Sequence, residues 1–512
     1  MRAAVIDIGS TTMNLVIGED DGENIKTLET LTNVIDIGRG AFYQGRISQR
    51  EIKQTTGILE NYKRLINEYA VTNIKVIATT AVREAENANM FIDTIFRKTG
   101  LEIEIFNVGD VIFYLDSYLS QKLKHSYPLH EKNLIIAEMG SGSLDISVME
   151  KGYILTNLGI PAGTLRLKQF KMLLDGSQEE IYGALNDYID SEFAHIRQIT
   201  PKIKIDDVIL IDEMYSRYLQ HILPNKKRES NFFKFSSREA HNLVERITEE
   251  RLDEIGSRYN IPPYIADCFD GYSITLRKLL SLVRNRYIYI LETSLSEAML
   301  GNIIFGAEIS KKYNKGNQLV SAARFICQKY NADLKHAKSV AGIAEQLFSF
   351  FKEMLGLDDE DRIYLILSAY LYNIGQFVSN RAHHKHAEYI INSMQLFRLT
   401  KREIKLIACV ARYHRKAPPQ RTHPLYASLD PQDQIMVQKL SALIRMAHAL
   451  DSSHRQKAKR LEYEETDHQE INLVVHSVDN FMYEKTVFAE RKRLFEELSG
   501  NKVNLIVKKS SA

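Results

Sequence analysis

Residues 134–149 read LIIAEMGSGSLDISVM, and they repeat the pattern of residues 3–17, which read AAVIDIGSTTMNLVI. When one segment is laid over the other, Glu138 falls on Asp7. Each copy is a short apolar strand that ends in a carboxylate, then a turn of Gly and Ser or Thr, then a second strand. The repeat predicts two half-domains of the same construction that face each other across a cleft.

The chemistry of the two turns favours phosphate. Glycine lets the backbone N–H groups approach an oxyanion closely, and the hydroxyls add further donors. The expected phosphate-binding residues are Gly9, Ser10, Thr11 and Thr12 in the first turn, and Gly140, Ser141, Gly142 and Ser143 in the second. The carboxylates before the turns, Asp7 and Glu138, are suited to hold the Mg²⁺ that bridges to phosphate. The alternative is a pair of ordinary β-hairpins with glycine turns.

Composition indicates a globular protein of ordinary balance. The chain has 512 residues, 44% of them hydrophobic and 26% charged, which is enough for about three or four domains at ~150 residues each. Cys268, Cys327 and Cys409 are too far apart to predict a disulfide framework or a zinc site. No apolar run approaches the ~18 residues of a membrane span, so we expect a cytoplasmic protein without a membrane partner.

The formal net charge of +2 does not argue for a specific nucleic-acid partner. Basic residues nevertheless gather late in the chain, in the ranges 311–312, 412–416, 455–460 and 491–493. These clusters fit either a groove for a polyanion or solvated helix faces.

The order of elements predicts four domains. Strands and helices alternate through 1–125 and again through 126–310, which predicts two α/β domains. Periodicity is helical through 311–457, after a polar linker at 311–316, and short alternating runs in 458–512 predict a small α+β domain. Within the first domain, the threonines 79–80 follow a strand at a helix start, where free N–H groups favour an anion, and Arg83 would add donors.

Several ordered motifs resemble the exopolyphosphatase and guanosine pentaphosphate phosphohydrolase family. They are Asp7-Ile8-Gly9-Ser10, the stretch ATTAVREA at 78–85, TGLEIE at 99–104, Gly140-Ser141-Gly142-Ser143, and GTLRL at 163–167. The resemblance covers roughly residues 1–305. Further on, ARYHRK at 411–416 and RMAHALDSSH at 445–454 resemble the helical HD-type domain of longer members.

The resemblance implies duplicated actin-like, ribonuclease H-like α/β domains followed by an all-α HD-like domain. It also implies Mg²⁺-dependent release of the terminal phosphate from inorganic polyphosphate or of the 5′-phosphate from guanosine pentaphosphate (pppGpp), commonly by a homodimer. Carried over residue by residue, the family's metal-holding acid falls on Glu138 and its water-activating acid on Asp110. A further acid of the constellation falls on Asp145.

The chain departs from the family pattern at several positions. Glu138, Asp110 and Asp145 keep the charge but each exchanges Asp and Glu, and a 1 Å misplacement can cost on the order of 10²-fold in rate. In the early loop, Asp36 stands where the family usually has a basic residue. Two expected Gly loops are replaced by Asp-Glu-Met at 212–214, which would repel phosphate, and by Thr-Ser-Leu-Ser at 293–296.

The helical domain departs further from a metal-binding HD pattern. His336 fits the first ligand, but Tyr372 and Asn373 stand where a His-Asp pair is expected, and His448 replaces the later Asp. The histidines at 383, 384 and 386 form another cluster. We therefore expect a structural or polyanion-binding role for this domain.

Three hypotheses follow. The first is a Mg²⁺-dependent phosphoanhydride hydrolase in which Asp110, Glu138 and Asp145 are catalytic and Arg83 binds phosphate with the two turns. The second is a regulatory protein that binds polyphosphate or a nucleotide without turnover, supported by Asp36 and the altered loops. The third is an ATP-using kinase, although no sugar-binding signature stands out.

Overall fold

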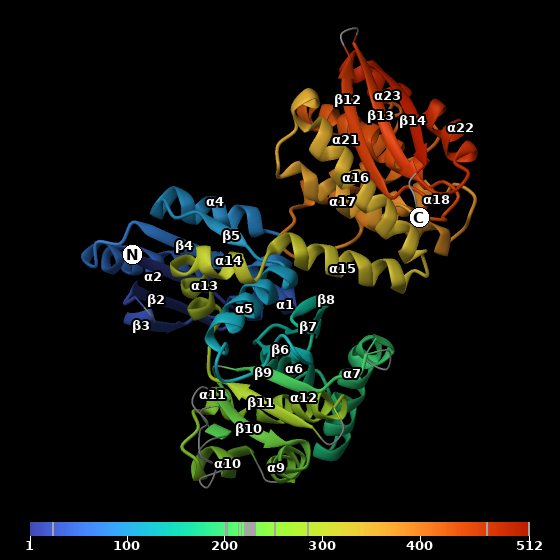
Figure 1. Ribbon diagram of the computed structural model, residues 1–512. Coiled ribbons are helices and arrows are strands. Elements are labelled where there is room, and N and C mark those ends of the chain that lie inside the picture. The colour runs from blue at the N-terminus through green and yellow to red at the C-terminus, as the bar shows by residue number, and fades with distance from the viewer. Residues whose placement is uncertain are drawn as a thin grey trace. The chain divides into compact units, whose positions relative to one another are not determined.

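The computed structural model describes residues 1–22, 25–199, 203–212, 214–216, 218–219, 232–249, 252–283, 286–466 and 469–509 (Figure 1). The chain forms two compact units, residues 1–314 and residues 315–512. The first unit contains two mixed sheets, and the second combines helices with a three-stranded sheet. The predicted fold class is confirmed.

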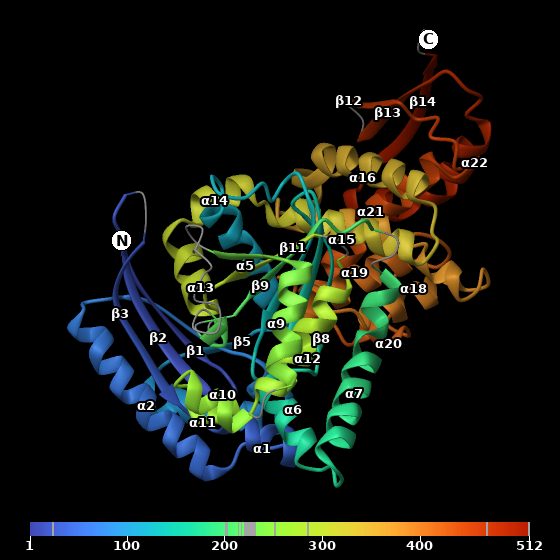
Figure 2. The same ribbon diagram turned by 90° about the horizontal axis from the view of Figure 1, so that it is seen from below.

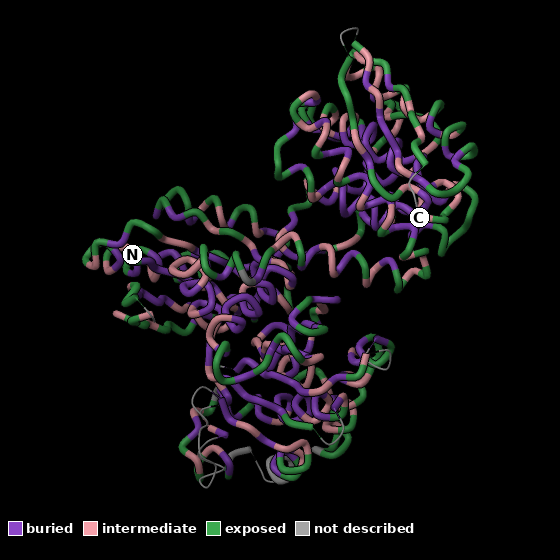
Figure 3. The backbone as a smooth tube through the Cα atoms, in the orientation of Figure 1, coloured by how far each residue is buried: buried purple, intermediate pink, exposed green. Residues whose placement is uncertain are grey.

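The first sheet has the strand order β3-β2-β1-β4-β5. Its strands are β1 (Arg2–Ile8), β2 (Thr12–Asp20), β3 (Ile25–Val34), β4 (Asn73–Ala78) and β5 (Ile103–Ile105). β1 runs antiparallel to β2 and parallel to β4. Residues 3–6 of this central strand are all fully buried, as an apolar run without alternation predicts. Figure 3 shows buried backbone in the interior of the structure and exposed backbone at its outside.

The second sheet has the order β10-β11-β9-β6-β7-β8. Its strands are β6 (Asn133–Met139), β7 (Leu144–Glu150), β8 (Tyr153–Ile160), β9 (Asp207–Ile211), β10 (Phe232–Ser236) and β11 (Tyr287–Leu291). β6 is antiparallel to β7 and parallel to β9, which is the arrangement of β1 with β2 and β4. Asp7 pairs with Asn14 in the first sheet, and Glu138 pairs with Asp145 in the second. The repeat in the sequence is therefore a repeat in topology and register.

The helices of the first unit connect and cover these sheets (Figure 2). They are α1 (Ile37–Gln44), α2 (Gln49–Glu68), α3 (Thr80–Glu84), α4 (Ala88–Thr99), α5 (Val108–Lys122), α6 (Thr164–Lys171), α7 (Gln178–Ile199), α9 (Ser237–Glu249), α10 (Leu252–Arg258), α11 (Pro263–Ala266), α12 (Phe269–Ser281), α13 (Leu295–Ile304) and α14 (Gly306–Lys312). Capping boxes begin both α2 and α5, so their first N–H groups are satisfied within the chain.

Helix α13 follows the last strand of the second sheet but packs on the first sheet. It contacts β1, β2 and α5. A Cβ at Gly18 of β2 would lie 2.8 Å from Leu300 Cδ2, and a Cβ at Gly301 would lie 2.4 Å from Tyr118 Cδ2. Tyr118 also donates a hydrogen bond to Glu297 at 2.8 Å. The chain thus returns to its first half within the range 126–310 that sequence analysis assigns to the second domain.

The second unit begins with helices and ends in a small sheet. Its helices are α15 (Lys315–Lys329), α16 (Leu334–Leu355), α17 (Asp361–Leu371), η2 (Ile374–Phe377), α18 (His383–Asn392), α19 (Lys401–Arg412), α20 (Pro424–Ala427), α21 (Pro431–Leu450), α22 (Met482–Arg491) and α23 (Arg493–Ser499). The sheet has the order β12-β13-β14, from strands β12 (Arg460–Thr466), β13 (Glu470–Ser477) and β14 (Lys502–Lys509).

The predicted linker at 311–316 is shorter than expected. Helix α14 continues to Lys312 and α15 starts at Lys315, because neither Gly316 nor the lysines break the helical backbone. Among the residues described, no helix is long and apolar enough to span a membrane.

Candidate phosphate-binding site

The two Gly/Ser turns close in the same way. The Gly9 N–H donates to the Thr12 carbonyl at 3.0 Å, and the Gly140 N–H donates to the Ser143 carbonyl at 3.0 Å. A Cβ at Gly9 would lie 3.0 Å from the oxygen that its own N–H binds, so a side chain there would crowd the turn. The duplication therefore extends from the strands to the hydrogen bonds of the turns.

The turns also contact each other across the two halves of the first unit. Thr11 Oγ1 of the first turn and Ser141 Oγ lie 2.7 Å apart, and Ser143 Oγ lies 2.9 Å from Thr80 Oγ1 at the start of α3. Gly142 allows this approach, because a Cβ there would lie 2.6 Å from the Phe42 ring. The two turns thus form one hydrogen-bonded structure rather than two separate hairpins.

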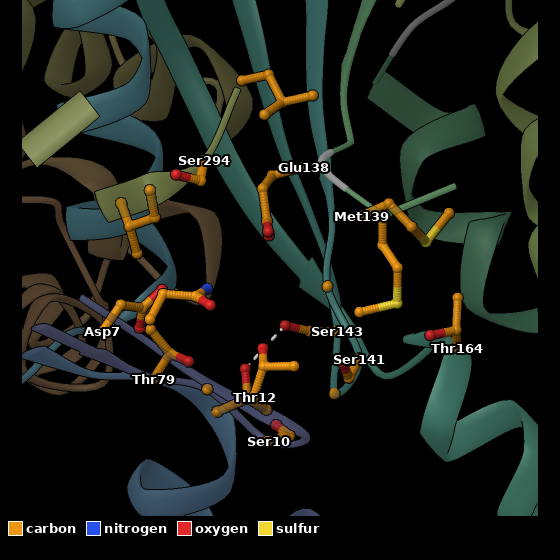
Figure 4. Close-up of a pocket in the computed structure, with 18 of the residues that line it drawn as sticks. Asp7, Ser10, Thr12, Thr79, Glu138, Met139, Ser141, Ser143, Thr164 and Ser294 are labelled. Atoms are coloured by element: carbon orange, nitrogen blue, oxygen red, sulfur yellow. Dashed lines mark hydrogen bonds between the residues drawn. The ribbon is translucent and has the colours of Figure 1, made fainter. Parts of the chain in front are cut away.

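A cavity of about 510 Å³ opens beside the paired turns (Figure 4). Of the predicted site residues, those that line it are Asp7, Gly9, Ser10, Thr12, Glu138, Gly140, Ser141, Gly142, Ser143 and Asp145. The carboxylates of Asp7 and Glu138 come from different sheets and reach toward the same space. No Lys, Arg or His occurs among the lining residues that the structure describes, so the cavity is rich in carboxylates and hydroxyls.

Three predicted residues lie outside the lining. Thr11 bonds to Ser141 instead. Arg83 donates from Nη1 to the Phe106 carbonyl at 2.7 Å and from Nη2 to Thr80 Oγ1 at 3.1 Å. Arg83 therefore binds Thr80, which lines the cavity, but does not line the cavity itself. Its contact with phosphate stays a prediction.

Asp110 lies one residue before Val111, which lines the cavity. Its backbone N–H binds Asn107 Oδ1 at 3.0 Å, and its Oδ2 accepts from the Asn107 N–H at 3.3 Å. These bonds form the capping box of α5 and give the carboxylate a structural role. A catalytic role for Asp110 stays a prediction.

Asp145 is the most enclosed of the acids in the lining, with 2% of its surface exposed. Burial raises the pKa of its carboxyl, while the charge of Arg83 acts in the opposite direction. Within the described part of the chain, its Oδ1 and the Oδ1 of Asn14, the matching position of the first repeat, have no hydrogen-bond partner. Both repeats thus place an oxygen atom beside the turns.

The donor set fits Mg²⁺. Carboxylate and amide oxygens are hard ligands, and Mg²⁺ is usually held by one or two carboxylates together with waters and substrate phosphates. Across the described ranges, no group of three or more His, Cys, Asp or Glu is arranged to hold a metal by itself. Asp7 and Glu138 on facing sheets match the sparser arrangement that Mg²⁺ uses.

Sequence analysis assigns no role to Arg166, although it lies in the GTLRL motif. Its Nε donates to the Gly142 carbonyl at 3.0 Å, and its Nη2 binds Glu84 at 2.6 Å. Its guanidinium also lies 4.2 Å from the centre of the Phe42 ring. Arg166 therefore holds the second turn in place from outside the cavity. In the sequence, the only signal for this role is the position of Arg166 in the GTLRL motif.

The segments that replace two expected Gly loops take other roles. Thr293 and Ser294 line the cavity, and Ser294 caps α13 by accepting from the Glu297 N–H at 3.2 Å. The expectation that Asp212 repels phosphate is wrong. Asp212 is 1% exposed, does not line the cavity, and accepts a hydrogen bond from Tyr272 Oη at 2.9 Å. Glu213 lies outside the described residues.

Asp212 also accepts from the N–H groups of Met214 and Tyr215 at 3.0 and 2.9 Å. Burial nevertheless raises the pKa of its carboxyl from 3.8 to about 6. The folded protein therefore holds a proton here more tightly than the unfolded chain does. The resulting contribution to the free energy of unfolding is fully present below pH 3.8 and is lost as the pH rises through about 6.

We expect Asp212→Asn to remove this pH dependence, because the amide keeps an oxygen for the N–H groups but does not titrate. A pKa difference of roughly 2 corresponds to about 3 kcal/mol in all, of which the wild type should lose about 2 kcal/mol relative to the variant between pH 4 and pH 7. Urea unfolding at both pH values measures it. Asp93→Asn, at an exposed site on α4, is the control for loss of a carboxylate. Parallel pH profiles of wild type and Asp212→Asn would contradict the prediction.

In the second unit, His336 is held by partners within the protein. Its Nδ1 donates to Asp451 Oδ2 at 2.9 Å, and its Nε2 accepts from Tyr372 Oη at 2.5 Å. Its ring stacks on His454 with centroids 3.5 Å apart. Both ring nitrogens are therefore engaged in hydrogen bonds.

Each of the two units matches a model of a known protein family. Residues 15–254 match the model of the Ppx/GppA phosphatase family, and residues 320–492 match that of Ppx/GppA phosphatase, domain III. Exopolyphosphatase 1 of Mycobacterium bovis is 24% identical over 198 residues, which are 38% of this chain and 56% of that protein. The chain thus spans about half the length of this relative.

A longer match is the guanosine-5′-triphosphate,3′-diphosphate pyrophosphatase of Photobacterium profundum, 19% identical over 435 residues, which cover 81% of this chain and 80% of that one. Among solved structures, an exopolyphosphatase from Cytophaga hutchinsonii superposes with a TM-score of 0.53 at 19% identity over 60% of this chain and 99% of its own. The Aquifex aeolicus Ppx/GppA family member gives 0.51 at 20% identity over 60% and 98%. These structures share the fold, and the matching models, motifs and duplicated turns together show that the chain belongs to the Ppx/GppA phosphatase family.

Proposed function

We propose that this protein hydrolyses the terminal phosphoanhydride bond of inorganic polyphosphate, or releases the 5′-phosphate of pppGpp, with Mg²⁺ held by Asp7 and Glu138. The observation that carries this proposal is the pair of equivalent carboxylate-and-turn units that meet at one cavity. The exopolyphosphatase and pyrophosphatase relatives support the same reaction class.

The residues of the cavity divide the work of such a reaction. The groups of the two turns that line the cavity, apart from the Gly9 and Gly140 N–H groups that close the turns, bind phosphate oxygens and hold the terminal phosphate in place. Bound Mg²⁺ supplies positive charge to the phosphate oxygens. Asp145 orients the attacking water and accepts its proton, because its Oδ1, which has no partner among the described residues, belongs to a carboxyl that lines the cavity.

The test follows from the charge of the lining. Since the described lining contains carboxylates but no Lys, Arg or His, the substrate's charge must be neutralised largely by the metal. We therefore expect release of phosphate from polyphosphate or pppGpp with Mg²⁺, and a loss of at least about 100-fold when EDTA removes it. Colorimetric phosphate detection measures both. Equal release with and without EDTA would exclude the proposed metal role.

The second candidate is a regulatory protein that binds these compounds without turnover. The capping box of α5 favours this alternative. Asp110 is the predicted water-activating acid, but its carboxylate already accepts a hydrogen bond that caps the helix. Mg²⁺-dependent binding of polyphosphate or pppGpp with no phosphate released would identify this alternative.

A further inference from the structure

A group of histidines lies inside the second unit next to His336, whose ring centroid is 6.0 Å from that of His448. The rings of His383 and His414 stack with centroids 5.5 Å apart, and those of His414 and His448 lie 5.2 Å apart. His383 begins α18, His414 follows the end of α19, and His448 lies on α21. α18 packs on α19 and α19 packs on α21, so the three rings meet between these helices.

Two of these histidines have a ring nitrogen without a hydrogen-bond partner in the described part of the protein. His414 is fully buried, and its Nδ1 donates to the Ala411 carbonyl at 2.8 Å, which leaves Nε2 as a bare acceptor in the neutral ring. His383 is 4% exposed and its Nδ1 faces the Asn380 carbonyl at 3.3 Å, with the same result. Neither Nε2 has a hydrogen-bond partner among the residues described. Burial lowers the pKa of both imidazoles, so the rings are neutral.

Three arginines lie near the histidines: the charges of Arg415 and Arg491 act on His448, and Arg445 binds the carbonyl of Tyr413, the residue before His414. Arg445 is 6% exposed, and its Nη1 and Nη2 donate to the carbonyls of Tyr413 and Lys416 at 3.0 and 2.9 Å, which fixes the loop that carries His414. Buried N–H groups without a partner in the described structure are Nε of Arg415, Nε of Arg445, and Nε and Nη1 of Arg491. Burial lowers the pKa of Arg415, and the charge of Arg491 lowers it further.

The cluster is therefore chemically complementary to one kind of ligand. Adjacent guanidinium groups repel a metal cation and attract an anion, and Arg491 offers an oxyanion separate N–H donors on Nε and Nη1. The bare imidazole nitrogens need a donor, which a fully deprotonated anion does not have. A phosphate that retains a proton at neutral pH satisfies both requirements, because it accepts from the arginines and donates from its P–OH.

We propose that the histidine–arginine cluster, made of His383, His414, His448, Arg415, Arg445 and Arg491, binds inorganic phosphate in a protonated form. Arg491 and Arg415 donate to its oxygens, and Nε2 of His414 accepts from its P–OH. The site is independent of the cavity in the first unit and of any catalytic activity there.

Isothermal titration of the full chain with phosphate at pH 7.5, in the presence of EDTA so that no metal-dependent site contributes, tests the proposal. We expect phosphate to bind and Arg491→Gln to weaken binding on the order of 10- to 100-fold. Arg493→Gln, two residues on and exposed, is the matched control and should bind as the wild type does. Sulfate, which carries no proton at this pH, should bind at least about 10-fold more weakly.

A second variant makes the result independent of the arginine. His414→Phe keeps an aromatic ring but removes the acceptor, so the preference for phosphate over sulfate should disappear. The proposal is overturned if wild type binds neither anion or if sulfate binds as tightly as phosphate. Circular dichroism of each variant confirms that it is folded.

Discussion

Glu138→Gln is expected to reduce Mg²⁺-dependent phosphate release by about 100-fold or more. Mutation of a residue that supports a metal ligand typically lowers metal affinity or activity about 10–100-fold. Loss of a direct ligand should therefore lower activity at least as much. Glutamine has nearly the same shape as glutamate but lacks the charge that neutralises the cation. Glu138 lines the cavity at the end of β6 and faces Asp7 of the other sheet, so no other charge of the second turn can replace it at that position. Steady-state kinetics over a range of Mg²⁺ concentrations measures the effect.

The control is Glu150→Gln, which removes the same charge from the exposed end of β7 and should leave activity unchanged. Glu138→Asp keeps the charge but withdraws it by one methylene, so it should lose less than the glutamine variant and need more Mg²⁺. Wild-type activity in Glu138→Gln would show that the metal is bound elsewhere.

Gly163→Ala is expected to abolish most activity, although alanine can adopt the backbone conformation of residue 163. Its φ of −66° and ψ of 152° suit any residue, so flexibility is not the reason for glycine. Instead, a Cβ there would lie 2.3 Å from the Gly142 carbonyl carbon, 2.4 Å from Ser141 O and 2.4 Å from Ser143 N. These atoms are the backbone of the second turn, which must therefore move.

A shift of about 1 Å in a positioned group can cost on the order of 10²-fold in rate, and overpacking typically costs 1–3 kcal/mol. Activity and thermal unfolding of the variant measure the two effects separately. Gly183→Ala in α7 is the matched control, because nothing lies within 4 Å of its Cβ and alanine should stabilise the helix by up to about 1 kcal/mol. Wild-type kinetics in Gly163→Ala would show that the turn's position does not control the reaction.

The repeat could be recognised from sequence because its information is local. The apolar strand, the terminal acid and the glycine turn lie within a few residues of one another, and the register of β6 with β7 follows from the short turn between them. The alternation of strands and helices in the first unit followed from the same kind of local pattern, whereas the actin-like fold class followed from the family resemblance.

What sequence could not provide depends on contacts between distant segments. The packing of α13 on the first sheet cannot be read from the apolar face of α13, which is suited to either sheet. The orientation of Asp212 away from phosphate depends on Tyr272, sixty residues further along the chain. The contact of Arg166 with Glu84 joins the two halves of the unit across 82 residues.

The return of α13 to the first sheet has a consequence for synthesis on the ribosome. Strands β1 and β2 emerge first, but the helix that covers them is among the last segments of the unit to be translated. Until residue 304 has left the exit tunnel, the apolar surface that Leu300 later buries is open to solvent or to chaperones. The first half of this unit therefore completes its fold only after the second half has been made, and a nascent chain arrested between residues 125 and 295 should be sensitive to proteolysis.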